Sequence, residues 1–135
     1  MPKKILVVED TKGIREIVAY MLRSQGYEVT ESADGVDAQE KVTAIQPDLI
    51  ILDAMLPRKT GFELCAELKR DDRWKKVPIL MLTAITRDTG KSDAYWREKS
   101  HADDFMSKPF KATELVQRVV KLLSGGDKGD GEATS

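Results

Sequence analysis

The sequence has little of what disulfide-rich, nucleic-acid-binding and membrane proteins depend on. Its 135 residues include one cysteine, Cys65, so no disulfide can form within the chain. Basic and acidic residues number 22 and 23, and a net charge of -1 gives no general electrostatic reason to bind nucleic acid or an acidic membrane. The N-terminal apolar run is far shorter than a secretory h-region of about 7 residues or more, or a membrane span of about 20. These absences predict a soluble, cytoplasmic protein with Cys65 as a small buried residue.

Short apolar runs recur along the chain. Residues 5–8, 49–52 and 77–82 form runs that are too short for helices and lack the period-2 alternation of a strand exposed on one face. Such runs are typical of strands covered on both faces in a parallel sheet. Two weaker runs, at residues 27–32 and 102–107, predict strands nearer the sheet edges.

Helix patterns separate these runs. The first should begin at Asp10 or Thr11 and end at Gly26, with a core face of Ile14, Ile17, Val18, Met21 and Leu22. Others should begin near Asp34 and near Thr60, and residues 86–100 show a weaker pattern. The last helix is the clearest, with apolar positions at Leu115, Val116, Val119, Val120, Leu122 and Leu123.

Strand and helix patterns therefore alternate five times. This order predicts an α/β fold, a flavodoxin-like doubly wound (βα)5 domain with a five-stranded parallel sheet in the order 2-1-3-4-5. The last eleven residues, 125–135, contain no large apolar side chain and are expected to form a disordered tail.

Reactive side chains follow four of the five predicted strands. They are Glu9 and Asp10 after the first, Asp53 at the end of the third, Thr83 after the fourth and Lys108 after the fifth. Ligands bind at the carboxyl ends of the strands in sheets of this kind. Three neighbouring carboxylates repel unless a cation joins them, and such oxygen ligands suit Mg²⁺. With a lysine and a hydroxyl added, the group predicts a phosphoryl site, although each acid taken singly fits a helix cap or turn former.

Four segments carry a family resemblance. ILVVED, PDLIILDAMLPRKTGFEL, VPILMLTA and ADDFMSKPF resemble the receiver domain of two-component response regulators. The resemblance covers residues 3 to about 124, which gives an expected receiver domain at 1–124 and a tail at 125–135.

The resemblance implies a role for each reactive residue. Asp53 would be the phosphoacceptor, and Thr83 and Lys108 would contact the phosphoryl group. Phe105 would act with Thr83 as the switch pair, and the Lys108–Pro109 bond would be cis. The implied Mg²⁺ ligands are Glu9, Asp10, Asp53 and the backbone carbonyl of Met55.

Some positions depart from the common family pattern. The first acid is Glu9 rather than Asp, so we expect Asp10 to contact the metal directly and Glu9 to act through a water. His101 stands where relatives often have glycine, and a histidine tolerates a positive φ better than a branched residue. Tyr95 and Trp96 either pack the fourth helix or form a partner-binding surface.

The function implied is phosphoryl transfer to Asp53 from a sensor histidine kinase or a phosphotransfer protein, with Mg²⁺ as cofactor. The chain would catalyse only its own phosphorylation and dephosphorylation. Its output would be binding of a downstream protein through the face made by the fourth helix, fifth strand and fifth helix, as a monomer or a phosphorylation-dependent dimer. No nucleic-acid or membrane partner is expected, as in single-domain chemotaxis and motility regulators.

Other functions remain open at this point. The chain could be a receiver-like interaction module that works without phosphorylation, or the N-terminal receiver fragment of a longer regulator. A flavodoxin-like cofactor protein is disfavoured because EDTKG, after the first strand, offers acids in place of a phosphate-cradling loop. An aspartyl-type phosphatase is disfavoured because Met55 stands where a second acid is needed.

Overall fold

The computed structural model of the chain describes residues 2–83 and 101–124. The predictions for residues 86–100, for Tyr95 and Trp96, and for the tail at 125–135 lie outside the described residues. The strands are β1 (Lys4–Val8), β2 (Glu28–Ser32), β3 (Leu49–Asp53), β4 (Ile79–Thr83) and β5 (Asp104–Ser107). The helices are α1 (Lys12–Ser24), α2 (Gly35–Ile45), α3 (Gly61–Arg70) and α6 (Ala112–Leu123).

The five strands form one parallel sheet in the order β2-β1-β3-β4-β5, which confirms the predicted topology. The two weaker runs are the edge strands, as expected. The register brings the strand ends together: Val8 lies beside Leu52 and Ser32, and Thr83 lies beside Ser107. Groups that follow these strands therefore meet at one edge of the sheet.

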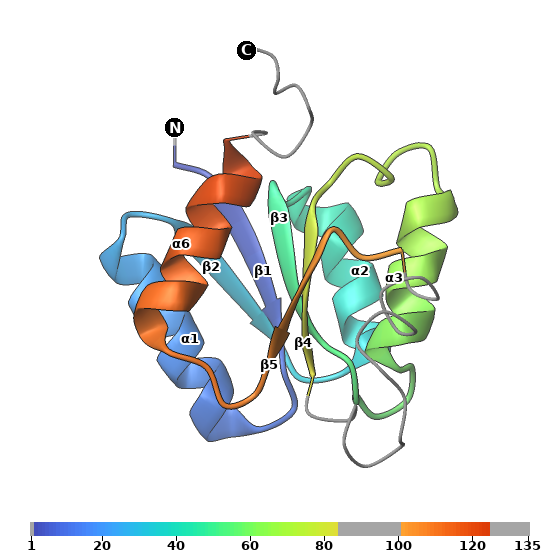
Figure 1. Cartoon of the computed structure of the whole chain (residues 1–135). Helices are drawn as coiled ribbons and strands as arrows, with labels where there is room; N and C mark the ends of the chain where they lie inside the picture. The colour runs from blue at the N-terminus through green and yellow to red at the C-terminus, as the bar shows by residue number, and fades with distance from the viewer. Residues whose placement is uncertain (1, 84–100, 125–135) are drawn as a thin grey trace.

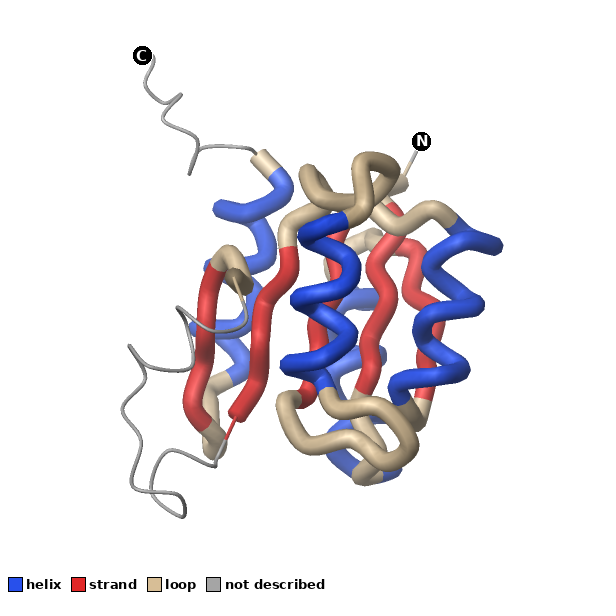
Figure 2. Tube along the Cα trace, turned by 90° about the vertical axis from the view of Figure 1, so that its right-hand side faces the viewer, coloured by secondary structure: helices blue, strands red, loops and turns tan. Residues whose placement is uncertain are grey.

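Helices cover both faces of the sheet, with α1 and α6 on one side and α2 and α3 on the other (Figure 1). Alternate strand residues point to opposite faces. Leu6, Ile50 and Met81 pack with α2 and α3, the helices in front of the sheet in Figure 2. Ile51 and Leu80 pack with α1 and α6. The strands in the middle of the sheet are buried on both sides, which explains their unbroken apolar runs.

The expected helix starts are present. The Asp34 side chain accepts from the Asp37 N–H at 2.7 Å and caps α2. At α3, Thr60 and Glu63 each accept the other's backbone N–H, at 3.1 and 3.0 Å, which is a capping box. Gly26, just beyond α1, has a φ of 94°, a conformation that glycine adopts without strain.

Two residues expected in the core are exposed instead. Ile17 is 61% exposed and Val120 is 50% exposed. Successive helix residues are about 100° apart, so Ile17 lies far from the centre of the face that α1 buries. Val18, Ala19 and Leu22 hold that centre in α1, and the prediction for Ile17 was wrong. No helix in the described residues has the length and apolar content needed to cross a membrane.

Candidate functional site

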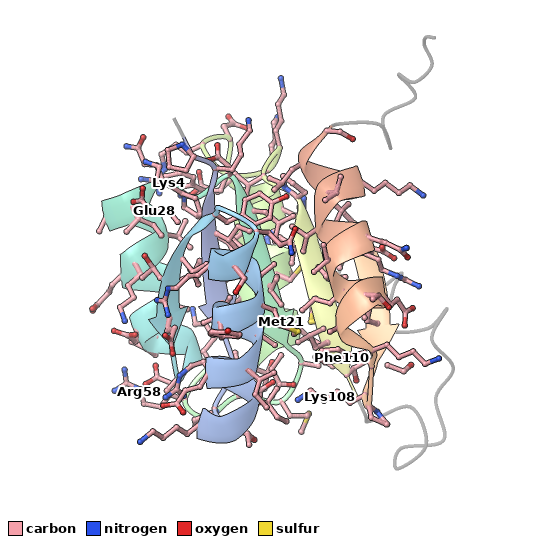
Figure 3. All side chains as sticks on the ribbon, turned by 90° about the vertical axis from the view of Figure 1, so that its left-hand side faces the viewer. Lys4, Met21, Glu28, Arg58, Lys108 and Phe110 are labelled. Atoms are coloured by element: carbon pink, nitrogen blue, oxygen red, sulfur yellow. The ribbon has the colours of Figure 1, made fainter. Side chains whose placement is uncertain are left out.

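Three carboxylates meet at the carboxyl edge of the sheet. Oxygen atoms of Glu9, Asp10 and Asp53 all lie within 4.8 Å of one another. Figure 3 shows Lys108 at this end of the molecule, opposite Lys4 and Glu28 at the starts of β1 and β2. The fold thus brings together acids that are as far as 44 positions apart, because parallel strands end at a common edge.

Lys108 connects the acids to the end of β4. Its Nζ lies 2.9 Å from Glu9 Oε1 and 3.3 Å from Asp53 Oδ1. Its backbone N–H donates to the Thr83 carbonyl at 2.9 Å, which continues the pairing of β4 and β5 by one residue. The backbone of Lys108 is therefore held against β4, and its ammonium has two anionic neighbours.

Burial differs among the site residues. Glu9 is fully buried, and Asp53 and Thr83 are 5% and 1% exposed. Asp10 is exposed. The longer of the two adjacent acids is therefore the one that points inward, toward Lys108. Which of them contacts a metal directly and which acts through a water stays a prediction.

The electrostatics of the site are unbalanced. Burial, followed by the charge of Glu9, raises the pKa of Asp53 from 3.8 to about 7, against the opposing effect of Lys108. Burial by itself would lower the pKa of Lys108, but Glu9 and Asp53 together raise it. The site contains three carboxyl groups and the ammonium of Lys108, which lies beside two of them, so it has an excess of negative charge.

These residues fit a divalent cation. Glu9 Oε1 is buried without a hydrogen bond, because Lys108 approaches it at ion-pair distance but outside hydrogen-bond geometry. A buried oxygen of this kind is costly unless a further partner satisfies it. Carboxylate oxygens gathered at this spacing are the donor set that Mg²⁺ uses, with its remaining positions taken by water and phosphate.

The turn after β3 is held close to Asp53. The Met55 N–H points at Asp53 Oδ1 at 3.4 Å, and Met55 itself is 55% exposed. The Gly61 N–H donates to the Ala54 carbonyl at 3.0 Å. A Cβ on Gly61 would collide with the Asp53 carbonyl, so only glycine allows α3 to begin against the end of β3.

The remaining expected positions are also defined. Phe105 is 4% exposed and packs in the core cluster on the α2–α3 side, so its ring is already inside the protein. The Lys108–Pro109 peptide is cis, and His101 has a φ of 63°. The switch role of Phe105 and Thr83 concerns a change between two conformations, so it stays a prediction.

The matching family model is that of the response regulator receiver domain, over residues 5–120. The chain belongs to this family. A receiver domain that crystallised with a magnesium ion in its active-site cleft, from the sensor histidine kinase PA1611 of Pseudomonas aeruginosa, superimposes with a TM-score of 0.80. It is 33% identical, and the match covers 93% of this chain and 99% of that one.

The curated relatives of this receiver are longer proteins. The DNA-binding dual master transcriptional regulator RpaA of Synechocystis is 40% identical, over 95% of this chain and 52% of its own length. The phosphate regulon regulator PhoB of P. aeruginosa is 40% identical, over 97% of this chain and 56% of its own. The chain thus spans about half the length of these relatives.

Two residues of the receiver site were not anticipated from the sequence. Gly61 was visible only as a glycine after a turn, and its closeness to Asp53 depends on the fold. Arg15 donates to the Glu9 carbonyl at 2.9 Å. Nothing in the sequence distinguished it from the other 21 basic residues, because its role depends on where α1 starts relative to β1.

Proposed function

We propose that the receiver accepts a phosphoryl group on Asp53, in a Mg²⁺-dependent reaction, from a histidine kinase or a phosphotransfer protein. The observation that carries this proposal is the cluster of Glu9, Asp10 and Asp53 with Lys108 at the carboxyl edge of the sheet. The proposed receiver unit comprises residues 1–124.

The transfer needs one nucleophile and little other covalent chemistry. A carboxylate oxygen of Asp53 attacks phosphorus while the bond from phosphorus to the histidine nitrogen breaks. The electron pair of that bond goes to the imidazole, which takes up a proton. Asp53 is suited to this step because its pKa of about 7 leaves a substantial ionised fraction near neutrality and because β3 holds it rigidly.

The other site residues would neutralise and orient the transferred group. Lys108 would pair with the phosphoryl oxygens, and the Thr83 hydroxyl would donate to one of them. The carboxylates of Glu9, Asp10 and Asp53 with the Met55 carbonyl would hold Mg²⁺. When bound, the ion supplies positive charge to the phosphoryl oxygens and to the three acids.

The phosphodonor would dock next to the site. A groove of about 460 Å³ lies beside Lys108, lined by Ile14, Ile17, Val18, Lys108, Pro109 and Phe110. Ile17 is largely exposed on its rim. Because Lys108 belongs both to the groove and to the acid cluster, a protein seated there could present a phosphohistidine to Asp53. We therefore propose that the phosphodonor that uses this groove is a protein.

The output would be a change of binding surface. Attraction of Lys108 and Thr83 to a phosphoryl group would act on β5 and α6 through the Lys108–Thr83 backbone bond. Such a change is a shift between two packed states and is limited by the contacts that differ between them. We propose that a downstream protein binds the face that includes β5 and α6.

A single experiment tests the phosphoacceptor. The chain is incubated with acetyl phosphate and Mg²⁺ and weighed intact, beside Asp53→Asn and the control Asp72→Asn, whose side chain is 92% exposed. The parent and the Asp72 variant should gain one phosphoryl group and the Asp53 variant none. A parent that binds Mg²⁺ and gains no mass would favour a receiver that works without phosphorylation.

A second candidate is the receiver part of a longer transcriptional regulator. It is favoured by the relatives RpaA, which is named as DNA-binding, and PhoB, each about twice as long as this chain. The expected absence of a nucleic-acid partner therefore stays a prediction. An immunoblot of the source cells decides between them, since a single-domain receiver migrates at the mass of these 135 residues and a fused regulator at about twice that mass.

A further inference from the structure

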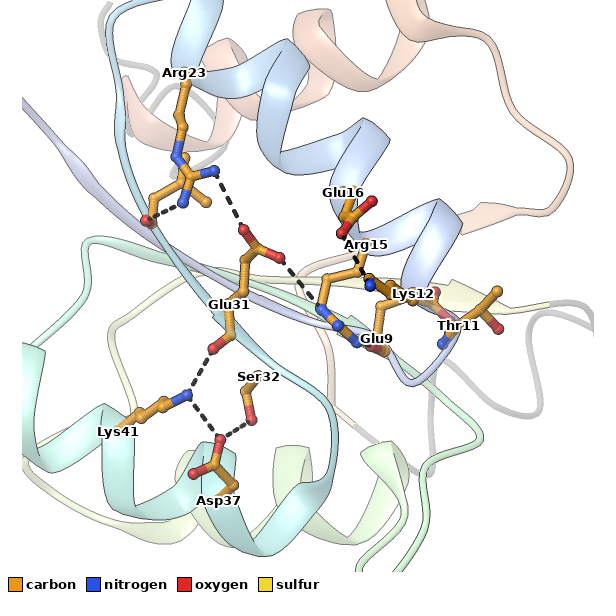
Figure 4. A network of polar contacts seen from close by, with 11 residues as sticks. Glu9, Thr11, Lys12, Arg15, Glu16, Arg23, Glu31, Ser32, Asp37 and Lys41 are labelled. Atoms are coloured by element: carbon orange, nitrogen blue, oxygen red, sulfur yellow. Dashed lines mark hydrogen bonds and ion pairs between the residues drawn. The ribbon is translucent and has the colours of Figure 1, made fainter.

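Glu9 lies beside Arg15 and Thr11 at the start of α1 (Figure 4), and it has polar contacts in several directions. The Glu9 N–H donates to the Ser32 carbonyl at 3.0 Å, and the Glu9 carbonyl accepts from Arg15 Nη1 at 2.9 Å. Glu9 Oε2 accepts from the Thr11 N–H at 3.2 Å, and Oε1 faces Lys108. Each polar group of Glu9 is therefore approached by a different residue.

Arg15 is itself held in place. Its Nε lies 3.3 Å from Glu31 Oε1, and its side chain is only 17% exposed. The other oxygen of Glu31 accepts from Arg23 Nη1 at 3.2 Å, and Arg23 also donates to the Val29 carbonyl at 2.9 Å. Figure 4 shows Glu31 between the two guanidinium groups, with Arg15 on the side of Glu9 and Arg23 away from it.

The hydrogen bond to the Glu9 carbonyl fixes the position of the Asp10 backbone. The peptide unit is planar, so fixing the Glu9 oxygen also fixes the N and Cα of Asp10. Asp10 is exposed, and no described residue offers its carboxylate a hydrogen bond or an ion pair. Its position in the cluster of three acids therefore depends on this peptide rather than on side-chain contacts.

We propose that Arg15 is a positioning residue for the divalent cation. With its guanidinium held by Glu31, Arg15 fixes the Glu9–Asp10 peptide so that both carboxylates face Asp53. The role needs arginine because one planar group supplies donors in two fixed directions, to a carbonyl and to a carboxylate. The inference rests on the proposed function, since it concerns the same Mg²⁺ site.

The test compares Arg15→Gln with Arg23→Gln in the full chain, by calorimetric titration with Mg²⁺. Each variant loses one ion pair to Glu31 and one hydrogen bond to a backbone carbonyl, so the two are matched in what they remove from the fold. Arg15→Gln should weaken Mg²⁺ binding by about tenfold, the size seen when a residue that orients a metal ligand is removed. Arg23→Gln should leave the affinity close to that of the parent.

Further measurements separate positioning from charge and from stability. Arg15→Lys keeps the charge but not the two fixed donors, so it should bind Mg²⁺ as weakly as Arg15→Gln. Hydrogen exchange at the Thr11 amide, which is bonded to Glu9, should accelerate in Arg15→Gln and not in Arg23→Gln.

Two results overturn the proposal while leaving the metal site intact: equal Mg²⁺ affinities for Arg15→Gln and Arg23→Gln, or full recovery in Arg15→Lys. A parent chain that does not bind Mg²⁺ is a different outcome, because it overturns the proposed function together with this inference.

Discussion

Two partly buried lysines lie at opposite ends of the sheet and face very different surroundings. Lys69 Nζ, near the start of β4, lies 2.6 Å from Asp103 Oδ2 and 2.9 Å from the Val77 carbonyl. Asp103 Oδ2 also accepts the Ile79 N–H at 2.8 Å. There, one cation meets one anion, and the Lys69 ammonium also donates to the Lys75 carbonyl at 3.2 Å. At the other end, Lys108 meets more negative charge than it can neutralise.

The difference separates a structural ion pair from a reactive one. The Lys69–Asp103 pair joins α3, the start of β4 and the segment before β5, and it leaves no net charge to attract a ligand. The Lys108 cluster keeps a surplus of carboxylate and an oxygen without a hydrogen bond, which a bound cation would satisfy. Charge balance, more than burial, therefore indicates which end carries the chemistry.

The largest effect should come from breaking the balanced pair. Lys69→Met leaves the partly buried Asp103 without its cation, and we expect a loss of about 3 kcal/mol in the free energy of unfolding, measured by urea denaturation. The loss should be the same with and without Mg²⁺. In Lys108→Met the loss should be smaller at saturating Mg²⁺ than in EDTA, because the ion takes over the neutralising role. If Lys108→Met lost the same free energy of unfolding with Mg²⁺ and in EDTA, the proposed distinction between the balanced and the unbalanced lysine would be wrong.

The unbalanced end should be a source of instability in the metal-free protein. The native Asp53 carboxyl keeps its proton up to about pH 7, and the unfolded one loses it near 3.8, so stability falls as the pH rises between these values. Asp53→Asn should abolish this fall and be more stable than the parent at pH 8 in EDTA, by roughly 2–3 kcal/mol. Urea denaturation at pH 5 and pH 8 measures both. The idea fails if the parent and variant show the same change between the two pH values.

A smaller effect concerns the groove beside Lys108. Ile17→Glu places a charge on its rim and should slow phosphoryl transfer from a phosphohistidine protein by about tenfold, the size of one disrupted apolar contact. Transfer from acetyl phosphate should not change, because a small donor does not use the groove. Val120→Glu, at a similarly exposed position on α6, is the control. Slower reaction with both donors would place Ile17 in the chemistry instead of in docking.

The last prediction concerns the labelling rate of Cys65, which leaves both the stability and the phosphoryl transfer of the parent chain unchanged. Burial raises the pKa of this thiol to about 12, so alkylation at pH 8 should be at least about 100-fold slower in the native protein than in the unfolded chain. Cys65 lies on α3, the helix that Lys69 anchors. Lys69→Met should therefore accelerate labelling, and Lys108→Met should not. Rapid labelling of the native parent would show that α3 opens without either change.

Much of the fold could be read from the sequence because the sheet is covered on both faces. In a chain of this length, unbroken apolar runs such as residues 49–52 and 5–8 are typical of strands at the centre of a covered parallel sheet. Capping signals at Asp34 and Thr60 are local, and the structure contains both. The exposed Ile17 could not be foreseen, because apolar periodicity does not reveal how wide the buried face of a helix is.

The site was predictable to the extent that it is made of strand ends. Asp53, Lys108 and the acids after β1 each follow an apolar run, and the sheet order brings them together. Arg15 and Gly61 follow no such rule. One acts through a backbone carbonyl and the other through the absence of a side chain, and neither interaction is visible until the chain has folded.

Gly61 also allows α3 to pack tightly against the end of β3. The first turn of α3 rests on the backbone of Asp53 with no room for even a methyl group between them, and the capping box at Thr60 and Glu63 stiffens that turn. Close-packed protein interiors have low compressibility and transmit strain. We therefore expect a phosphoryl group on Asp53 to gain no space by displacing the first turn of α3. We expect the movement that follows the proposed phosphorylation at the ends of β4 and β5 instead, and the missing Cβ of Gly61 would help to set that direction.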